Sequence, residues 1–183
     1  MFLIDSSYFI GELTLPNIPV QEAASGGVAL ALQTVGENNL DVFANKYIVE
    51  YLICLFGREL TIKFIEEIKK PTPDTIWTNI KDQLLIEIDS YKASPLANYV
   101  YYWVRRAGES KLTQGGVADP DFDFAQNVSN RRETASVWNN MADMTIAIDK
   151  WFRKNIEDYK DYYGDLTGRD VRNITGKINE YGI

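Results

Sequence analysis

Histidine is absent from this chain of 183 residues. Histidine is the usual general base near neutral pH and the commonest metal ligand, so Ser–His and Cys–His nucleophile pairs and histidine metal sites are excluded. Cys54 is the only cysteine, which excludes an internal disulfide, and its apolar surroundings favour a buried, unreactive thiol. We therefore expect a protein that is not an enzyme, and we assign no catalytic, cofactor-binding or metal-ligating residue.

Basic residues are also scarce. The chain has 19 Lys and Arg against 26 Asp and Glu, a formal net charge of -7. Affinity for a phosphate backbone comes from Lys and Arg that displace counterions, so non-specific nucleic-acid binding is not expected. A long apolar run is missing as well, because Glu50 breaks the densest one, Tyr47 to Phe56, and Asp5 interrupts the start. We expect neither a secretory signal nor a membrane span, and hence a protein that stays inside the cell that makes it.

Residues 1–37 show no sustained helical period. Prolines and glycines divide them into short pieces at Pro16, Pro19, Gly26, Gly27 and Gly36. The apolar groups between these breaks are too hydrophobic for a solvated tail. The sequence therefore predicts an extended N-terminal arm, which packs either on its own chain or on a partner.

From residue 38 the pattern becomes helical. Apolar residues recur at three- and four-residue spacing in stretches separated by Gly and Pro, which predicts helices near 39–56, 58–69, 75–84, 94–106 and from about 124 to 159. Ile86-Glu87-Ile88 alternates and is consistent with extended chain, and residues 109–123 are expected to form a loop. The last predicted helix has no internal Gly or Pro and is long enough to project from its domain or bridge to a neighbour.

These patterns predict a mainly α fold, a helical bundle with one long C-terminal helix and an extended N-terminal arm. The arm covers residues 1–37, the helical domain residues 38–160, and a C-terminal tail or short helix residues 161–183.

The stretch from Ser94 to Arg106 is the most aromatic of the predicted helices. Ser94 can act as its N-cap and Pro95 suits the first helical position, while Leu96 and Val100 begin an apolar face. Its tyrosines widen that face so far that one neighbouring element is not expected to cover it. We therefore expect burial in a bundle together with a subunit contact.

Two arginine pairs offer the best case for binding phosphate, because paired guanidinium groups can grip its oxygens. These are Arg105-Arg106 and Arg131-Arg132, and Glu109 and Glu133 lie close enough in sequence to neutralise them. We favour ion pairs within or between subunits over nucleic-acid contact. The residues expected at an interface are Tyr101, Tyr102, Arg105, Arg131, Arg132 and Trp151.

The other acidic motifs give weaker evidence for a metal-binding or catalytic site. Asp119-Pro120-Asp121-Phe122-Asp123 has the alternating acids of a calcium loop, but Phe124 stands where the turn needs glycine. The adjacent acids Glu66-Glu67 and Glu157-Asp158 point about 100° apart on a helix, so we interpret both pairs as solvated helix faces.

Several of these stretches together resemble phage head-tail connector proteins, especially those of crAss-like and other phages of Bacteroidetes hosts. The resemblance begins in Asn39 to Leu52 and Leu55 to Leu60, and continues in Ser94 to Arg106, Gly115-Gly116-Val117, and Arg131 to Met141 with its Trp138-Asn139-Asn140-Met141. It covers roughly residues 38–160.

The resemblance implies a mostly helical adaptor of the virion neck, made in the cytoplasm of the host bacterium. It would assemble as a ring, with twelve subunits expected, bind the portal and other neck or tail ring proteins, and form part of the channel for DNA without sequence specificity. No catalytic residue, cofactor or membrane contact is implied. An acidic chain suits such a conduit because it does not hold DNA. Two rival classes remain: a helical regulatory or nucleic-acid-binding module, and an enzyme that uses only carboxylates, Tyr or Lys.

Overall fold

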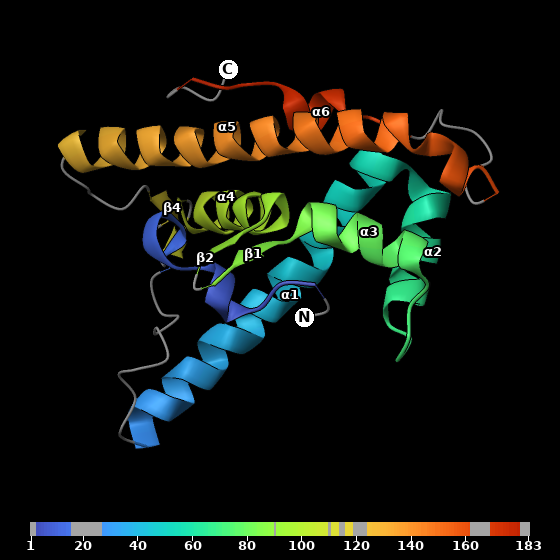
Figure 1. Ribbon diagram of the computed structural model, residues 1–183. Helices are drawn as coiled ribbons and strands as arrows, with labels where there is room; N and C mark the ends of the chain where they lie inside the picture. Colours follow the sequence, from blue (N-terminus) through green and yellow to red (C-terminus); the bar gives the residue numbers. More distant parts are fainter. Residues whose placement is uncertain are drawn as a thin grey trace.

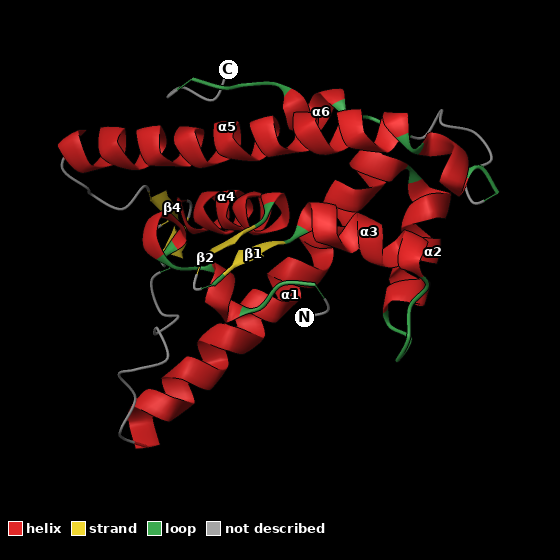
Figure 2. Ribbon diagram, viewed as in Figure 1, coloured by secondary structure: helices red, strands yellow, loops and turns green. Residues whose placement is uncertain are grey.

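Helices make up most of the architecture (Figure 2). The computed structural model describes residues 3–15, 27–89, 91–109, 111–113, 116–118, 124–161 and 169–179. Its helices are α1 (Gly27–Phe56), α2 (Arg58–Ile68), α3 (Thr75–Leu84), α4 (Pro95–Glu109), α5 (Phe124–Lys154) and α6 (Arg172–Thr175), with the short 3-10 turns η1 (Ser6–Tyr8), η2 (Gly11–Leu13) and η3 (Ile156–Tyr159). The predicted mainly α class is confirmed.

Helix α5 is the longest element and lies along one side of the molecule, with α4 beside it (Figure 1). The two helices are antiparallel, because Asn98 of α4 donates to the carbonyl of Val137 while Tyr101, further along α4, contacts the earlier residue Glu133. Helix α6 covers the opposite side of α5, where the buried Ile174 joins the core. The chain therefore places α5 between α4 and the C-terminal segment.

Two small antiparallel hairpins join the helices. In the first, β1 (Ile86–Ile88) pairs with β2 (Tyr91–Ala93), which confirms the extended conformation predicted for residues 86–88. In the second, β3 (Lys111–Thr113) pairs with β4 (Gly116–Ala118) inside the stretch expected to be only a loop. The sequence indicated only a loop here because this stretch is rich in Gly and Asp, which favour turns.

Helix α1 begins at Gly27, so residues 27–37 of the predicted extended arm are helical instead. Gly26, Gly27 and Gly36 had been interpreted as breaks. The run Val28-Ala29-Leu30-Ala31-Leu32 contains good helix formers, and a glycine inside a helix costs only about 1 kcal/mol relative to alanine, so Gly36 does not interrupt the helix.

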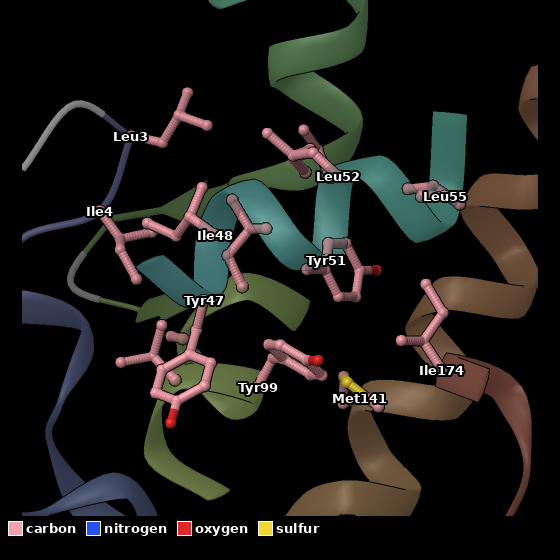
Figure 3. Close-up of a cluster of buried hydrophobic side chains, with 14 of the residues drawn as sticks. Leu3, Ile4, Tyr47, Ile48, Tyr51, Leu52, Leu55, Tyr99, Met141 and Ile174 are labelled. Carbon is pink, nitrogen blue, oxygen red and sulfur yellow. The ribbon is translucent and has the colours of Figure 1, made fainter. Parts of the chain in front are cut away.

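The hydrophobic core gathers around the second half of α1 (Figure 3). Tyr51 is fully buried there, and its hydroxyl lies 2.7 Å from the hydroxyl of Thr145 on α5, which satisfies both polar groups. Figure 3 shows side chains of this core from five parts of the chain: Leu3, Ile4, Tyr47, Ile48, Tyr51, Leu52, Leu55, Tyr99, Met141 and Ile174. Leu3 and Ile4 belong to the N-terminal arm, so the described part of the arm packs on its own chain.

The C-terminal segment closes the end of α1. Arg169 Nε donates to the carbonyl of Leu55 at 2.7 Å, and the backbone N–H of Asp170 donates to the carbonyl of Cys54 at 3.1 Å. Both acceptors lie in the last turn of α1, where carbonyls have no partner within the helix. Helix α5 ends at Lys154 rather than near Tyr159, because the chain tightens into η3.

Candidate functional site

Helix α4 begins as its sequence predicts. Ser94 Oγ accepts a hydrogen bond from the backbone N–H of Leu96 at 3.2 Å, and Pro95 occupies the first helical position. Leu96 and Val100 are completely buried. The tyrosines that one neighbouring element was not expected to cover are buried as well, because both α1 and α5 pack against this helix.

Tyr101 and Tyr102 are therefore not free surface residues. Only 1% of Tyr101 and 6% of Tyr102 is exposed in the single chain. Tyr101 donates its hydroxyl to the Glu133 carboxylate at 2.5 Å, and the ring of Tyr102 lies 4.5 Å from that of Trp138. The rings of both tyrosines, which were expected at an interface, are thus already covered by this chain.

Burial and the carboxylate of Glu133 both act on Tyr101. Burial is the larger cause, and the two together raise the pKa of the Tyr101 phenol well above its ordinary value. The hydroxyl therefore remains protonated across the physiological range and acts as a hydrogen-bond donor that ties α4 to α5.

The arginines of α4 stack on aromatic rings. The guanidinium carbon of Arg105 lies 5.9 Å from the centre of the Tyr101 ring. Arg106 donates to the Tyr102 hydroxyl at 2.9 Å and lies 6.0 Å from the centre of the Trp103 ring. Arginines near the C-terminus of a helix are also favoured by its dipole. Glu133, which was expected to neutralise an arginine, accepts a hydrogen bond from the hydroxyl of Tyr101.

Arg131 and Arg132 lie on α5 and both are exposed. Because α4 and α5 are antiparallel, the arginines of the second half of α4 and of the first half of α5 belong to the same end of the helix pair. The sequence positions at this end of the helix pair, which we call the arginine end, include Arg105, Arg106, Arg131 and Arg132.

An open groove of about 530 Å³ adjoins the arginine end. It runs between α5 and the C-terminal segment and is lined by Arg132, Ala135, Ser136, Asn139, Asn140, Ile178 and Asn179. Asn139 builds one wall, because its amide both donates to the carbonyl of Ile178 and accepts from the N–H of Ile178, each at 2.9 Å. The lining combines polar side chains, one of them the cation Arg132, with the apolar Ala135 and Ile178.

Trp138, the residue before Asn139, also bonds to the C-terminal segment: its Nε1 donates to the carbonyl of Gly176 at 2.7 Å. Together they hold the extended residues 176–178 against α5.

Trp151 lies far from the other predicted interface residues. Twenty helical residues separate it from Arg131, which places the two about 30 Å apart along α5. Its half-buried ring contacts Tyr159, with 6.4 Å between ring centres. The six residues therefore do not form one patch.

Several apolar side chains are exposed, which the sequence did not predict. On the first hairpin Ile88 is 63% and Tyr91 61% exposed, and the register pairs them directly. Val42 on α1 is 71% exposed. The alternation of Ile86-Glu87-Ile88 indicated a strand but not that its apolar face would lie open.

The acidic motifs give no metal site in the part of the chain that the structure describes, where no three potential ligands gather. The calcium-like run 119–123 lies outside the described residues. Glu67 was interpreted as solvated but is 6% exposed, with Lys63 and Lys70 at 3.1 and 2.5 Å. Hydrogen bonds from Lys70 and then Lys63 lower the pKa of Glu67.

The remaining expectations concern Cys54 and the membrane. Cys54 is half-buried, and burial raises the pKa of its thiol. Among the described helices, none combines the length and apolar character needed to cross a membrane.

Comparisons with known proteins add no relative. No protein-family model matches the chain, and searches of curated proteins and of solved structures find no significant match.

Proposed function

We propose that the protein is a structural subunit of the phage neck, which assembles as a ring, joins the portal to the tail and forms part of the DNA channel. The resemblance of residues 38–160 to head-tail connectors suggests this function, and the mainly helical fold is consistent with it.

The observation that carries the proposal is the beginning of α1. Figure 1 shows it projecting from the rest of the molecule. Its sequence has no charged residue from Gly27 to Gly36 and includes Val28, Leu30 and Leu32. A projecting apolar helix is unfavourable in a solvated monomer but is buried when identical subunits pack side by side.

The arginine end adds a second contact surface. Arg131 and Arg132 are exposed on α5, while the chain as a whole carries a charge of -7. A local cationic site on an acidic chain is suited to the acidic surface of a neighbouring subunit or of the portal. The overall acidity lets DNA pass without being held.

Mass determination and negative-stain imaging test the proposal, on the chain alone and after mixing with the portal encoded near it. We expect rings, or a portal that gains a layer of density. A monomer that leaves the portal unchanged contradicts the proposal.

A matched pair of variants shows whether the beginning of α1 makes the contact. Leu30→Lys combined with Leu32→Lys is expected to abolish rings while the protein stays folded by circular dichroism. The control Ile62→Lys changes a half-exposed residue of α2 and is expected to leave assembly intact.

A helical nucleic-acid-binding module is the second candidate, and the four guanidinium groups at the arginine end favour it. Its signature is binding to duplex DNA that weakens steeply as salt rises.

A further inference from the structure

The N-terminal arm, defined here as residues 3–15, inserts apolar side chains into the core. Tyr8 is 2% exposed and Phe9 3%, values as low as those of core residues in the long helices. The buried members of the arm are Leu3, Ile4, Tyr8, Phe9 and Leu15. Their burial makes the arm an essential part of the fold rather than a surface tail.

The arm is nevertheless a self-contained unit. Its backbone hydrogen bonds in the described chain are all internal: Tyr8 to Asp5, Phe9 to Ser6, Leu13 to Ile10 and Thr14 to Gly11. The side chain of Asp5 caps the first turn by accepting from the N–H of Ser7 at 2.9 Å. Among the described residues no backbone hydrogen bond joins the arm to the body, so the arm can dock or leave without breaking a backbone ladder.

The body of the protein contacts the arm through side chains. The hydroxyl of Tyr8 donates to the Glu87 carboxylate of β1 at 2.6 Å, and the Lys92 ammonium of β2 lies 5.2 Å from the centre of the Tyr8 ring. The first hairpin thus supplies an acceptor and a cation for one tyrosine, while η2 packs against α4 and α5. We call this receiving surface the arm site.

The segment that connects the arm to α1 is long enough for the arm to reach the arm site of its own subunit or that of a neighbouring subunit. Eleven residues separate Leu15 from Gly27, and an extended chain of that length reaches about 40 Å. Gly27 then begins the part of α1 that projects from the molecule (Figure 1). If that projecting part packs on a neighbouring subunit, as the proposed function requires, it carries the preceding arm towards the neighbour's arm site.

We propose that the arm of each subunit occupies the arm site of the next subunit around the ring, an inference that rests on the ring assembly proposed above. The occupant is residues 3–15 of a second copy of this chain. Exchange of arms between subunits leaves every contact of the arm chemically the same, so no packing contact is lost. In a closed ring every arm site is filled, whereas an open chain leaves one arm and one site unfilled, which favours closure.

Mixed-isotope photocrosslinking of the full-length protein tests the exchange. Tyr8 is replaced by para-azidophenylalanine, which places the azide where the hydroxyl meets Glu87. Chains of natural isotope content and chains labelled with ¹⁵N are unfolded, mixed in equal amounts, refolded together and irradiated. Mass spectrometry then reads whether each crosslink joins an arm and a hairpin of the same label or of different labels.

Exchange predicts that about half of the arm–hairpin crosslinks join different labels, because each site draws its arm from a random neighbour. Crosslinks of one label only, in assemblies whose intact mass shows both labels, overturn the exchange and leave the ring standing. A protein that remains monomeric by mass, both alone and after mixing with the portal, overturns both the exchange and the proposed function.

A second crosslinker position guards against a Tyr8 variant that fails to fold. Ile10 is on the same arm but 42% exposed, so its replacement by para-azidophenylalanine removes little core packing. The same label pattern is expected from this position, and same-label crosslinks alone again contradict the exchange.

Discussion

At the scale of single residues, Arg169 joins three parts of the chain. Its side chain is 6% exposed, donates to the carbonyl of Leu55, pairs with Asp149 and lies 5.0 Å from the centre of the Phe152 ring. A buried guanidinium with this many partners is difficult to replace, because each partner loses a charge-assisted contact.

We predict that Arg169→Ala lowers the free energy of unfolding by about 3–5 kcal/mol, the range for breaking a buried ion pair. Urea denaturation followed by circular dichroism measures the change. The matched control is Arg153→Ala, which removes the second partner of Asp149 from a side chain that is 64% exposed. That variant is expected to lose no more than about 1 kcal/mol. Equal losses in both variants would contradict the role assigned to Arg169.

The buried tyrosines make the stability of the fold depend on pH. Burial raises the pKa of Tyr99 and Tyr159 to about 12, and it raises that of Tyr51 further; the phenols of Tyr8 and Tyr101 are raised by burial and then by a neighbouring glutamate. A pKa that is higher in the folded state stabilises the fold fully below the unfolded value, which for tyrosine is about 10. That stabilisation is lost as pH rises above it.

We therefore predict that the unfolding temperature falls steadily above pH 10. Absorbance of tyrosinate near 295 nm follows the ionisation directly. In the folded protein these five phenols are expected to stay protonated at pH 10.5, whereas in concentrated guanidinium chloride all eleven tyrosines titrate together. A folded titration curve that coincides with the unfolded one would refute the prediction.

At the scale of elements, the junction of α1 and α2 depends on Gly57. Its φ is +84°, in the left-handed region that glycine adopts without strain, and its backbone N–H closes α1 by donating to the carbonyl of Ile53 at 2.8 Å. The two helices can turn at a single residue because that residue has no side chain.

Gly57→Ala is expected to destabilise the protein by about 1–2 kcal/mol from backbone strain, since an added Cβ meets Arg169 Cγ only at an ordinary 3.6 Å. Gly176→Ala is the control, because Gly176 has a φ of -68° and its added Cβ also meets only an ordinary contact. Thermal unfolding of both variants compares them. If the control loses as much stability as Gly57→Ala, backbone strain at Gly57 is not the cause.

At the scale of the whole molecule, charge separates the two candidate functions. The chain carries -7 overall, although four arginines belong to one end of the α4–α5 pair. Long-range repulsion of a polyanion follows the whole charge distribution, while a local cluster acts only within about 8 Å at physiological salt.

We predict that the protein binds duplex DNA of random sequence with a Kd above about 10⁻⁴ M at physiological salt, which is weaker than typical non-specific binding. Fluorescence anisotropy of a labelled duplex measures the affinity. Replacing Arg131 and Arg132 by Ala is expected to leave it unchanged. Tight binding that this double variant abolishes would instead support the nucleic-acid-binding module.

The sequence predicted the secondary-structure elements better than it predicted which side chains are exposed. The start of α4 was predictable because Ser94 and Pro95 act on backbone groups within one turn of themselves. The exposure of Tyr101 and Tyr102 was not, because it depends on Glu133 and Trp138, which lie more than thirty residues away in the chain. The width of an apolar face in the sequence therefore does not reveal how many neighbouring elements cover it.

The amino-acid sequence by itself determined the mainly helical class, the cap of α4, the turn at Gly57 and the absence of histidine chemistry. These depend on local backbone preference and on composition. Only the tertiary structure decided that the arm enters the core, that Arg169 closes the end of α1 and that the apolar face of the first hairpin stays exposed. Each of these outcomes depends on contacts between segments distant in the chain, which a periodic pattern along one segment does not specify.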